Sequence, residues 1–138
     1  MSFKSIRMEA EDCIRSIYDD MKKDRLVRSF YISFVENFAN SYLEARKVQI
    51  PRDVLLRLIQ SFLRHKEETG EIVMGHTLFC ISCRKKILGP YGSKKPLPKL
   101  VECPNCNCVI DTENDYLLTE DKFFFVGKAQ EAAEIMKT

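Results

Sequence analysis

The sequence lacks several features that would place it in a special class. No uncharged apolar run approaches the roughly 18 residues that a membrane-spanning helix needs, and the first seven residues hold no signal-peptide core. Five Gly, five Pro and six Cys among 138 residues are too few for a disordered chain or a disulfide scaffold. We therefore expect a folded intracellular protein, cytoplasmic or nuclear and without membrane contact, whose cysteines are thiols or metal ligands.

Motifs of the common enzyme classes are also missing. The chain has neither a phosphate-binding glycine loop nor the H-E-x-x-H pattern of zinc proteases. Its two histidines, His65 and His76, stand next to no obvious nucleophile, which gives little support for acid–base catalysis. We expect a protein that is not an enzyme. A nucleophilic Cys108 is a weaker alternative, because the sequence shows no base for it.

Acidic residues are absent from one long segment. The net charge of +2 divides into +1 for residues 1–71, +6 for residues 72–101 and −5 for residues 102–138. The middle segment holds six Lys or Arg and no Asp or Glu. Such a block favours a polyanionic partner, nucleic acid above all, unless acids elsewhere in the fold neutralise it.

Apolar side chains recur at helical spacing through the first half of the chain, which predicts helices over residues 5–22, 25–47 and 51–68. The cations of the third helix, Arg57 and Arg64 among them, form either a nucleic-acid-binding face or a solvated face. Three such helices are typical of an antiparallel bundle or of the core of a winged helix.

The second of these helices has the widest apolar stripe, which includes Phe34 and Phe38. A stripe of this width predicts burial against more than one neighbour, so we expect core packing rather than a surface that stacks on bases. Asp24 is the expected N-cap of this helix.

The second half contains two C-x2-C pairs, Cys80 with Cys83 and Cys103 with Cys106, with nineteen residues between the pairs. Two cysteines at this spacing on a tight turn can aim both sulfurs at one ion, and a second such turn completes a tetrahedral site. The spacing lies within the range of structural zinc sites. We predict one Zn²⁺ per chain, bound by all four of these cysteines, with no open position for a water.

Two further residues can replace a ligand in this pattern. Cys108 lies two residues after Cys106, and His76 lies four residues before Cys80. The two pairs form the more economical set of ligands. We therefore expect Cys108 to be a small residue or free thiol beside the site, and His76 to be a linker residue or a polar contact.

Short apolar segments flank the cysteine pairs. We expect strands at residues 85–88 and 99–102, joined by a Gly- and Pro-rich tip, with a third strand at 109–110. With its cysteine pairs, the segment 78–110 resembles the zinc ribbon superfamily, which occurs in transcription factors, RNA polymerase subunits, translation factors and ribosomal proteins. In the commonest ribbon a Gly follows the second Cys of each pair, whereas here Arg84 and Asn107 hold those places.

These patterns together predict an α+β fold. A three-helix domain over residues 1–70, bundle or winged-helix-like, precedes a small four-cysteine zinc-ribbon β-hairpin domain over residues 71–138. The tail after residue 112 is expected to form a hairpin around residues 119–121 or a helix capped by Thr119. Gly127 favours a break, followed by a short helix over residues 128–136.

The leading hypothesis is a zinc-containing regulator of transcription or RNA that binds RNA or DNA through its basic hairpin. The helical half then binds a protein partner or a second copy of the chain. Tyr91 at the tip is expected to stack on a base. The expected nucleic-acid contacts are Arg84, Lys85, Lys86, Tyr91, Lys94, Lys95 and Lys99. The alternative is a zinc-stabilised protein-interaction or assembly module that makes no direct contact with nucleic acid.

Overall fold

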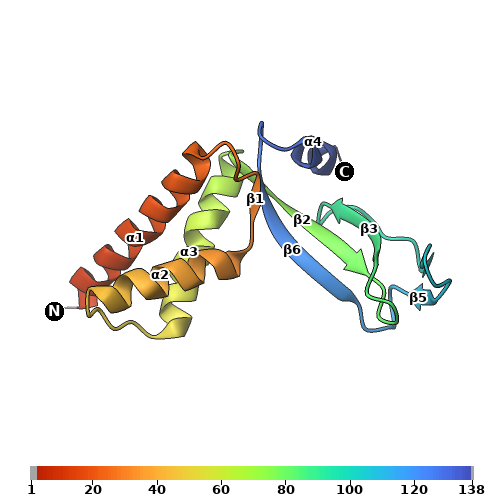
Figure 1. The fold of residues 1–138 in the computed structure, drawn as a ribbon, viewed down its shortest axis with the longest axis horizontal. Coiled ribbons are helices and arrows are strands. Elements are labelled where there is room, and N and C mark those ends of the chain that lie inside the picture. The colour runs from red at the N-terminus through yellow and green to blue at the C-terminus, as the bar shows by residue number, and fades with distance from the viewer. Residues whose placement is uncertain (1–2, 138) are drawn as a thin grey trace. The chain divides into compact units, whose positions relative to one another are not determined.

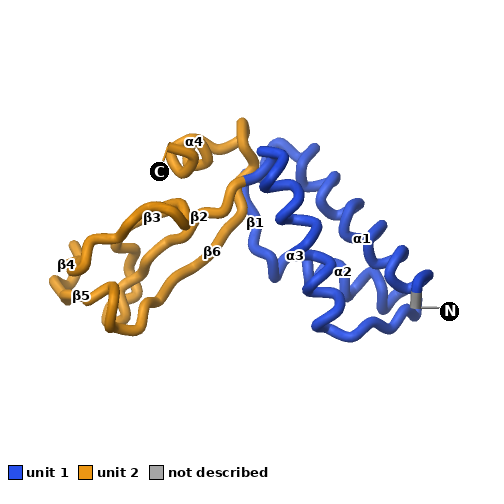
Figure 2. Tube along the Cα trace, turned by 180° about the vertical axis from the view of Figure 1, so that it is seen from behind, with its two compact units in different colours: residues 1–72 blue, residues 73–138 orange. Residues whose placement is uncertain are grey.

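The computed structural model describes residues 3–137 and divides the chain into two compact units, residues 1–72 and 73–138 (Figures 1 and 2). Within the described residues it contains four helices and six strands, so the predicted α+β class is confirmed. None of the helices in this part of the chain is both long and apolar enough to cross a membrane.

Three amphipathic helices build the first unit: α1 (Phe3–Lys23), α2 (Ile32–Ala45) and α3 (Arg52–Glu68). Their buried side chains recur every three or four positions, as the sequence pattern predicts. The core of this unit includes Ala10, Cys13, Ile14, Tyr18, Val35, Ala39, Leu43, Leu55, Ile59 and Leu63. Cys13 is 1% exposed and behaves as a small buried hydrophobe, remote in sequence from the other cysteines.

The second helix begins later than its apolar pattern predicts. The side chain of Asp24 accepts a hydrogen bond from the backbone N–H of Leu26 (2.9 Å), which is a turn and not a helix cap. Leu26 is 90% exposed, and a two-residue strand, β1 (Ser29–Phe30), precedes α2. The prediction of a helix over residues 25–31 is therefore wrong. The apolar residues of this segment recur at helical spacing, but the hydrogen bond of the Asp24 side chain turns the backbone out of a helix.

The expected burial of the aromatic stripe on α2 is also wrong. Phe34 and Phe38 are 42% and 54% exposed, and their ring centroids lie 4.6 Å apart. Tyr42, one turn further, is 38% exposed. The helix buries instead the neighbouring stripe that contains Val35 and Leu43. A band of aromatic surface consequently faces away from the core of this unit.

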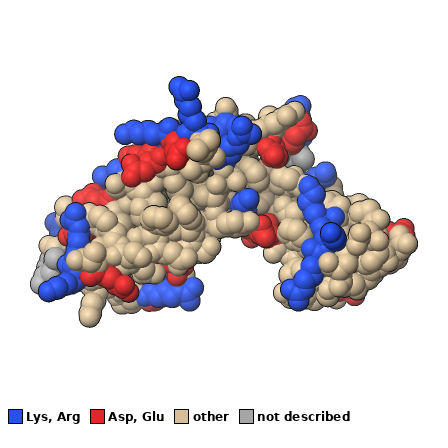
Figure 3. All heavy atoms as spheres, viewed as in Figure 1, with Lys and Arg blue, Asp and Glu red and all other residues tan. Residues whose placement is uncertain are grey.

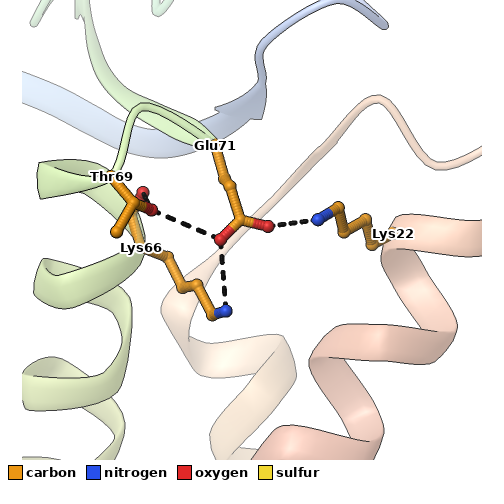
Figure 4. A network of polar contacts seen from close by, with 4 residues as sticks. All are labelled: Lys22, Lys66, Thr69 and Glu71. Atoms are coloured by element: carbon orange, nitrogen blue, oxygen red, sulfur yellow. Dashed lines mark hydrogen bonds and ion pairs between the residues drawn. The ribbon is translucent and has the colours of Figure 1, made fainter.

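A network of polar contacts closes the first unit where α3 ends (Figure 4). The carboxylate of Glu71 accepts hydrogen bonds from Lys22 of α1 and from Thr69, the latter at 3.3 Å. Its second oxygen also lies 3.1 Å from the Lys66 ammonium of α3. The hydrogen bond from Lys22, with Lys66 assisting, holds the pKa of Glu71 below its ordinary value.

The second unit contributes three neighbouring strands to one sheet, in the order β6 (Leu118–Phe125), β2 (Ile72–Phe79) and β3 (Lys86–Tyr91). A separate antiparallel pair is formed by β4 (Leu100–Glu102) and β5 (Val109–Asp111). The short helix α4 (Gln130–Met136) completes the unit.

The helix α4 packs on one face of this sheet. Ile135 and Ala132 of the helix join Phe124 in one buried cluster. A Cβ atom at Gly75 would lie 2.7 Å from Ile135 Cδ1 and 2.8 Å from a ring carbon of Phe124. The absence of a side chain at Gly75 therefore lets this face of β2 accept the helix closely.

Two expectations for the second half are wrong. The strand after the first cysteine pair does not form a hairpin with the strand before the second pair: β3 pairs with β2, and β4 pairs with β5. The tail forms neither a hairpin around residues 119–121 nor a helix capped by Thr119, because β6 runs without a break through them. The predicted break at Gly127, with φ of 90°, and the short helix after it are present.

Candidate metal centre

Each cysteine pair forms the turn of a β-hairpin. The first pair connects β2 to β3, and the second connects β4 to β5. The two turns repeat the same backbone hydrogen bonds. Cys80 N–H donates to the Lys85 carbonyl (2.9 Å) and Cys103 N–H donates to the Cys108 carbonyl (2.9 Å). The two turns are thus copies of one local structure, brought together from distant parts of the second unit.

The backbone of both turns reverses through a left-handed residue. Arg84 has φ of 62° and Asn107 has φ of 65°, at the positions where the commonest zinc ribbons carry Gly. Their N–H groups donate to the carbonyls of Cys80 (2.8 Å) and Cys103 (2.9 Å). Asn adopts this region readily, whereas Arg does so at some conformational cost. The departure from Gly in the sequence therefore leaves the turn geometry intact.

The four sulfurs lie at one point of the second unit. All Sγ atoms of Cys80, Cys83, Cys103 and Cys106 lie within 4.8 Å of one another. Two of these distances join the two turns: Cys80 to Cys106 at 3.5 Å and Cys83 to Cys103 at 3.6 Å. A tetrahedral zinc site with bonds of about 2.3 Å has sulfurs about 3.8 Å apart. The spacing of the thiols therefore fits one metal ion.

The thiols lie among donors that favour thiolates. The backbone N–H of Cys83 is the main influence that lowers the pKa of Cys80. The N–H of Lys85 and the side chain of Asn105 lower the pKa of Cys83 to about 6. Amide donors directed at sulfur are a common outer shell of cysteine–metal sites.

The thiol of Cys106 shows the effect of the neighbouring sulfurs on its pKa. The N–H of Cys108 lowers the pKa of Cys106, but the neighbouring sulfur of Cys80 and burial outweigh it and raise the pKa to about 12. Several thiolates this close together cannot all ionise, because like charges repel. A divalent cation removes that repulsion and allows all four sulfurs to bind as thiolates.

Neither alternative ligand belongs to the cluster. Cys108 Sγ contacts the hydroxyl of Ser82 at 3.8 Å. His76 lies in β2 and makes side-chain hydrogen bonds with Asp121 and Ser93 instead. The sequence spacing allowed Cys108 or His76 to replace one of the four ligands. The geometry of the hairpins instead brings together the two C-x2-C pairs.

The six basic residues of the segment 72–101 remain in solvent. Arg84, Lys85, Lys86, Lys94, Lys95 and Lys99 are exposed. None of the six forms an ion pair among the residues that the structure describes, although acids follow in the sequence. On the face drawn in Figure 3, a band of Lys and Arg atoms crosses the second unit. Tyr91 differs, because it is 8% exposed and packs against the His76 ring, so the exposed position expected for it at the tip is wrong.

Comparison with protein-family models, with curated proteins and with solved structures found no match to this chain. The interpretation of the site therefore depends on its own geometry and chemistry.

Proposed function

We propose that the chain is a zinc-containing nucleic-acid-binding protein. Four thiols at tetrahedral spacing, on two equivalent hairpin turns, support a structural zinc site of the zinc ribbon kind. Such a site has no open position for a substrate, so the metal's role is to stabilise the fold. The ion would hold together two hairpins whose strands are otherwise short.

The observation that carries the nucleic-acid proposal is the charge of residues 72–101. Six cations without an acid among them stand in solvent, outside any ion pair among the described residues. An uncompensated group of this kind attracts a polyanion and steers its approach. Lys94 and Lys95 lie in the irregular segment between β3 and β4, where a phosphate can reach them.

The exposed face of α3 supports the same proposal. Arg57, Gln60 and Arg64 lie on one side of this helix and are exposed, and Arg57 also pairs with Asp53 at 3.4 Å. Arginine and glutamine are the side chains that most often read base edges in the major groove. The order of elements, α1, β1, α2, α3 and then β2, is compatible with the winged-helix alternative and supports it over a plain bundle. We infer that duplex DNA is the nucleic acid that fits best.

Binding of the zinc-loaded full chain to duplex DNA at low salt tests the proposal. The variant with Lys94→Glu and Lys95→Glu should weaken binding across all sequences and make its salt dependence shallower, because two phosphate contacts are lost. A charge-matched control, Lys4→Glu with Lys23→Glu on α1, should change binding much less. Absence of binding by the wild type to duplex DNA and to RNA would contradict the proposed function.

Co-purification gives an independent readout. The chain has five Tyr and no Trp, so its own absorbance is weak and bound nucleic acid would dominate the spectrum at 260 nm. The ratio of absorbance at 260 nm to that at 280 nm should fall after a high-salt wash.

One observation favours a second function, the binding of another protein. Phe34, Phe38 and Tyr42 form an exposed aromatic band on α2, and the Arg46 guanidinium lies 4.4 Å from the centroid of the Tyr42 ring. Aromatic and Arg side chains are enriched in protein interfaces. Under this alternative, zinc stiffens the second unit and the helical unit supplies the contact. Sedimentation of the wild type and of Phe38→Glu, each alone and at several concentrations, would detect a self-association that depends on this band.

A further inference from the structure

Three polar side chains of the second unit form a continuous hydrogen-bonded chain that does not involve the metal centre. Asp121 Oδ1 lies 2.6 Å from His76 Nδ1, and Ser93 Oγ lies 2.8 Å from His76 Nε2. The imidazole is largely covered, with 22% of its side chain exposed, while Ser93 stands in solvent. This order of carboxylate, imidazole and hydroxyl is the arrangement that activates serine for nucleophilic attack.

The pleat of the sheet explains why these residues meet. His76 of β2 is the direct partner of Tyr91 in β3, so both side chains point to the same face. Ser93 follows Tyr91 by two residues, and Asp121 comes from β6, on the other side of β2. Their sequence separations of 17 and 45 residues explain why no local motif marks a nucleophile beside His76.

Glycine at position 89 permits this close approach of the strands. Gly89 has φ of 120°, and a Cβ atom there would lie 2.6 Å from the carbonyl oxygen of His76. The strand β3 therefore reaches the backbone of β2 next to His76 only because residue 89 has no side chain. The Tyr91 ring then packs on the imidazole, with centroids 5.6 Å apart.

The carboxylate sets the direction of one hydrogen bond. An ionised carboxylate can only accept, so Nδ1 of His76 carries a proton that points to Asp121. When the imidazole carries only this proton, the lone pair on Nε2 accepts the hydroxyl proton of Ser93. This is the tautomer that a general base needs.

We propose that Ser93 is an activated nucleophile for acyl transfer, with His76 as its base and Asp121 as a positioning residue. Ser93 Oγ attacks the carbonyl carbon of an ester and its proton passes to His76 Nε2. The carbonyl re-forms, the bond to the leaving oxygen breaks, and His76 returns the proton to that oxygen. Water then hydrolyses the acyl-serine by the same transfers, with His76 as the base, so that the enzyme is regenerated without a cofactor.

A cavity lies beside the loop that carries Ser93, although neither Ser93 nor His76 lines it. It measures about 410 Å³ and is lined by Leu88, Tyr91, Lys95, Leu97, Pro98 and Glu134. Two of these residues, Tyr91 and Lys95, stand two positions before and after Ser93. The volume is within the range of small-molecule sites, and its lining combines apolar side chains with one cation, Lys95, and one anion, Glu134, which suits a small ester without net charge.

A fluorophosphonate probe tests the nucleophile directly. The zinc-loaded full chain should form an adduct that peptide mass spectrometry locates at Ser93, and Ser93→Ala should abolish it. The exposed Ser61 of α3 provides a matched control, because Ser61→Ala should label as the wild type does. A wild-type chain that takes up no probe, or takes it up equally at other serines, overturns the proposal even if nucleic-acid binding is intact.

Variants of the partners distinguish activation from a structural hydrogen bond. His76→Ala should slow labelling by about a hundredfold or more, as expected for the loss of a general base. Asp121→Asn should lower kcat for p-nitrophenyl acetate with little change in KM, and Asp121→Glu should restore part of it. Helix content and metal content serve as checks of folding. The proposal is wrong if Asp121→Asn and Asp121→Glu have the same kcat, or if His76→Ala is labelled at the wild-type rate in a folded chain. The hydrogen bonds would then only hold the loop of Ser93 against the sheet.

Discussion

Two truncations on α2 separate its buried face from its exposed face. Leu43 is 2% exposed, and removal of a buried Leu side chain costs about 3–5 kcal/mol in stability. Phe38 is 54% exposed. Complete burial of a Phe side chain stabilises the fold by about 1.5–3 kcal/mol, so truncation of this half-exposed ring to Ala should cost about 1.5 kcal/mol or less. Truncation of the larger side chain, Phe38, is therefore expected to lower stability less than truncation of the smaller one, Leu43.

Unfolding in urea, followed by circular dichroism at 222 nm, measures this difference in the full chain. The helices α1, α2 and α3 have 21, 14 and 17 residues against 7 in α4, so the signal reports mainly on the first unit. Equal losses of stability for Leu43→Ala and Phe38→Ala would refute the assignment of faces. If the effect of Phe38→Ala instead grows with protein concentration, the aromatic band is buried in a second copy.

Three further predictions concern single positions. Glu71→Gln should lower stability by about 0.5–1 kcal/mol at pH 7. Because the pKa of folded Glu71 lies below its ordinary 4.5, this difference from wild type should persist above that pH and vanish as the pH falls through the folded value, as thermal melts at several pH values would show. Cys106→Ser should lose metal while Cys108→Ser retains it, and the reverse result in elemental analysis would move the fourth ligand to Cys108. Gly89→Ala should destabilise the sheet of the second unit, and unchanged amide hydrogen exchange in β2 and β3 would contradict the close approach seen there.

Local patterns in the sequence were sufficient to predict that the three helices exist and which four cysteines form the cluster, but not where α2 begins or which of its faces is buried. The buried residues of a helix recur at a fixed period along the sequence, and the two ligands of a C-x2-C turn lie within four positions of each other. The start of α2 was missed because Leu26 and Val27 continue the apolar spacing, although Asp24 turns the chain before them. Which of two apolar stripes on α2 faces the core depends on where α1 and α3 lie, which the spacing of one helix does not contain.

Features that depend on distant residues could not be read from the sequence. The pairing of β3 with β2, rather than with β4, depends on the reversal of the chain at the cysteine turns themselves. Tyr91 looked like an exposed tip residue because Gly and Pro surround it, but it lies opposite His76 and is buried. The chain from Asp121 through His76 to Ser93 joins three segments and carries no local signature.

The metal content of the purified full chain tests the central claim most directly. Elemental analysis should find one zinc ion per chain without added metal, and Cys103→Ser should contain none and lose the structure of the second unit while the helical signal largely persists. Wild-type protein that is folded, contains neither zinc nor iron, and shows no change in stability when zinc is added would contradict a metal centre at the two cysteine turns.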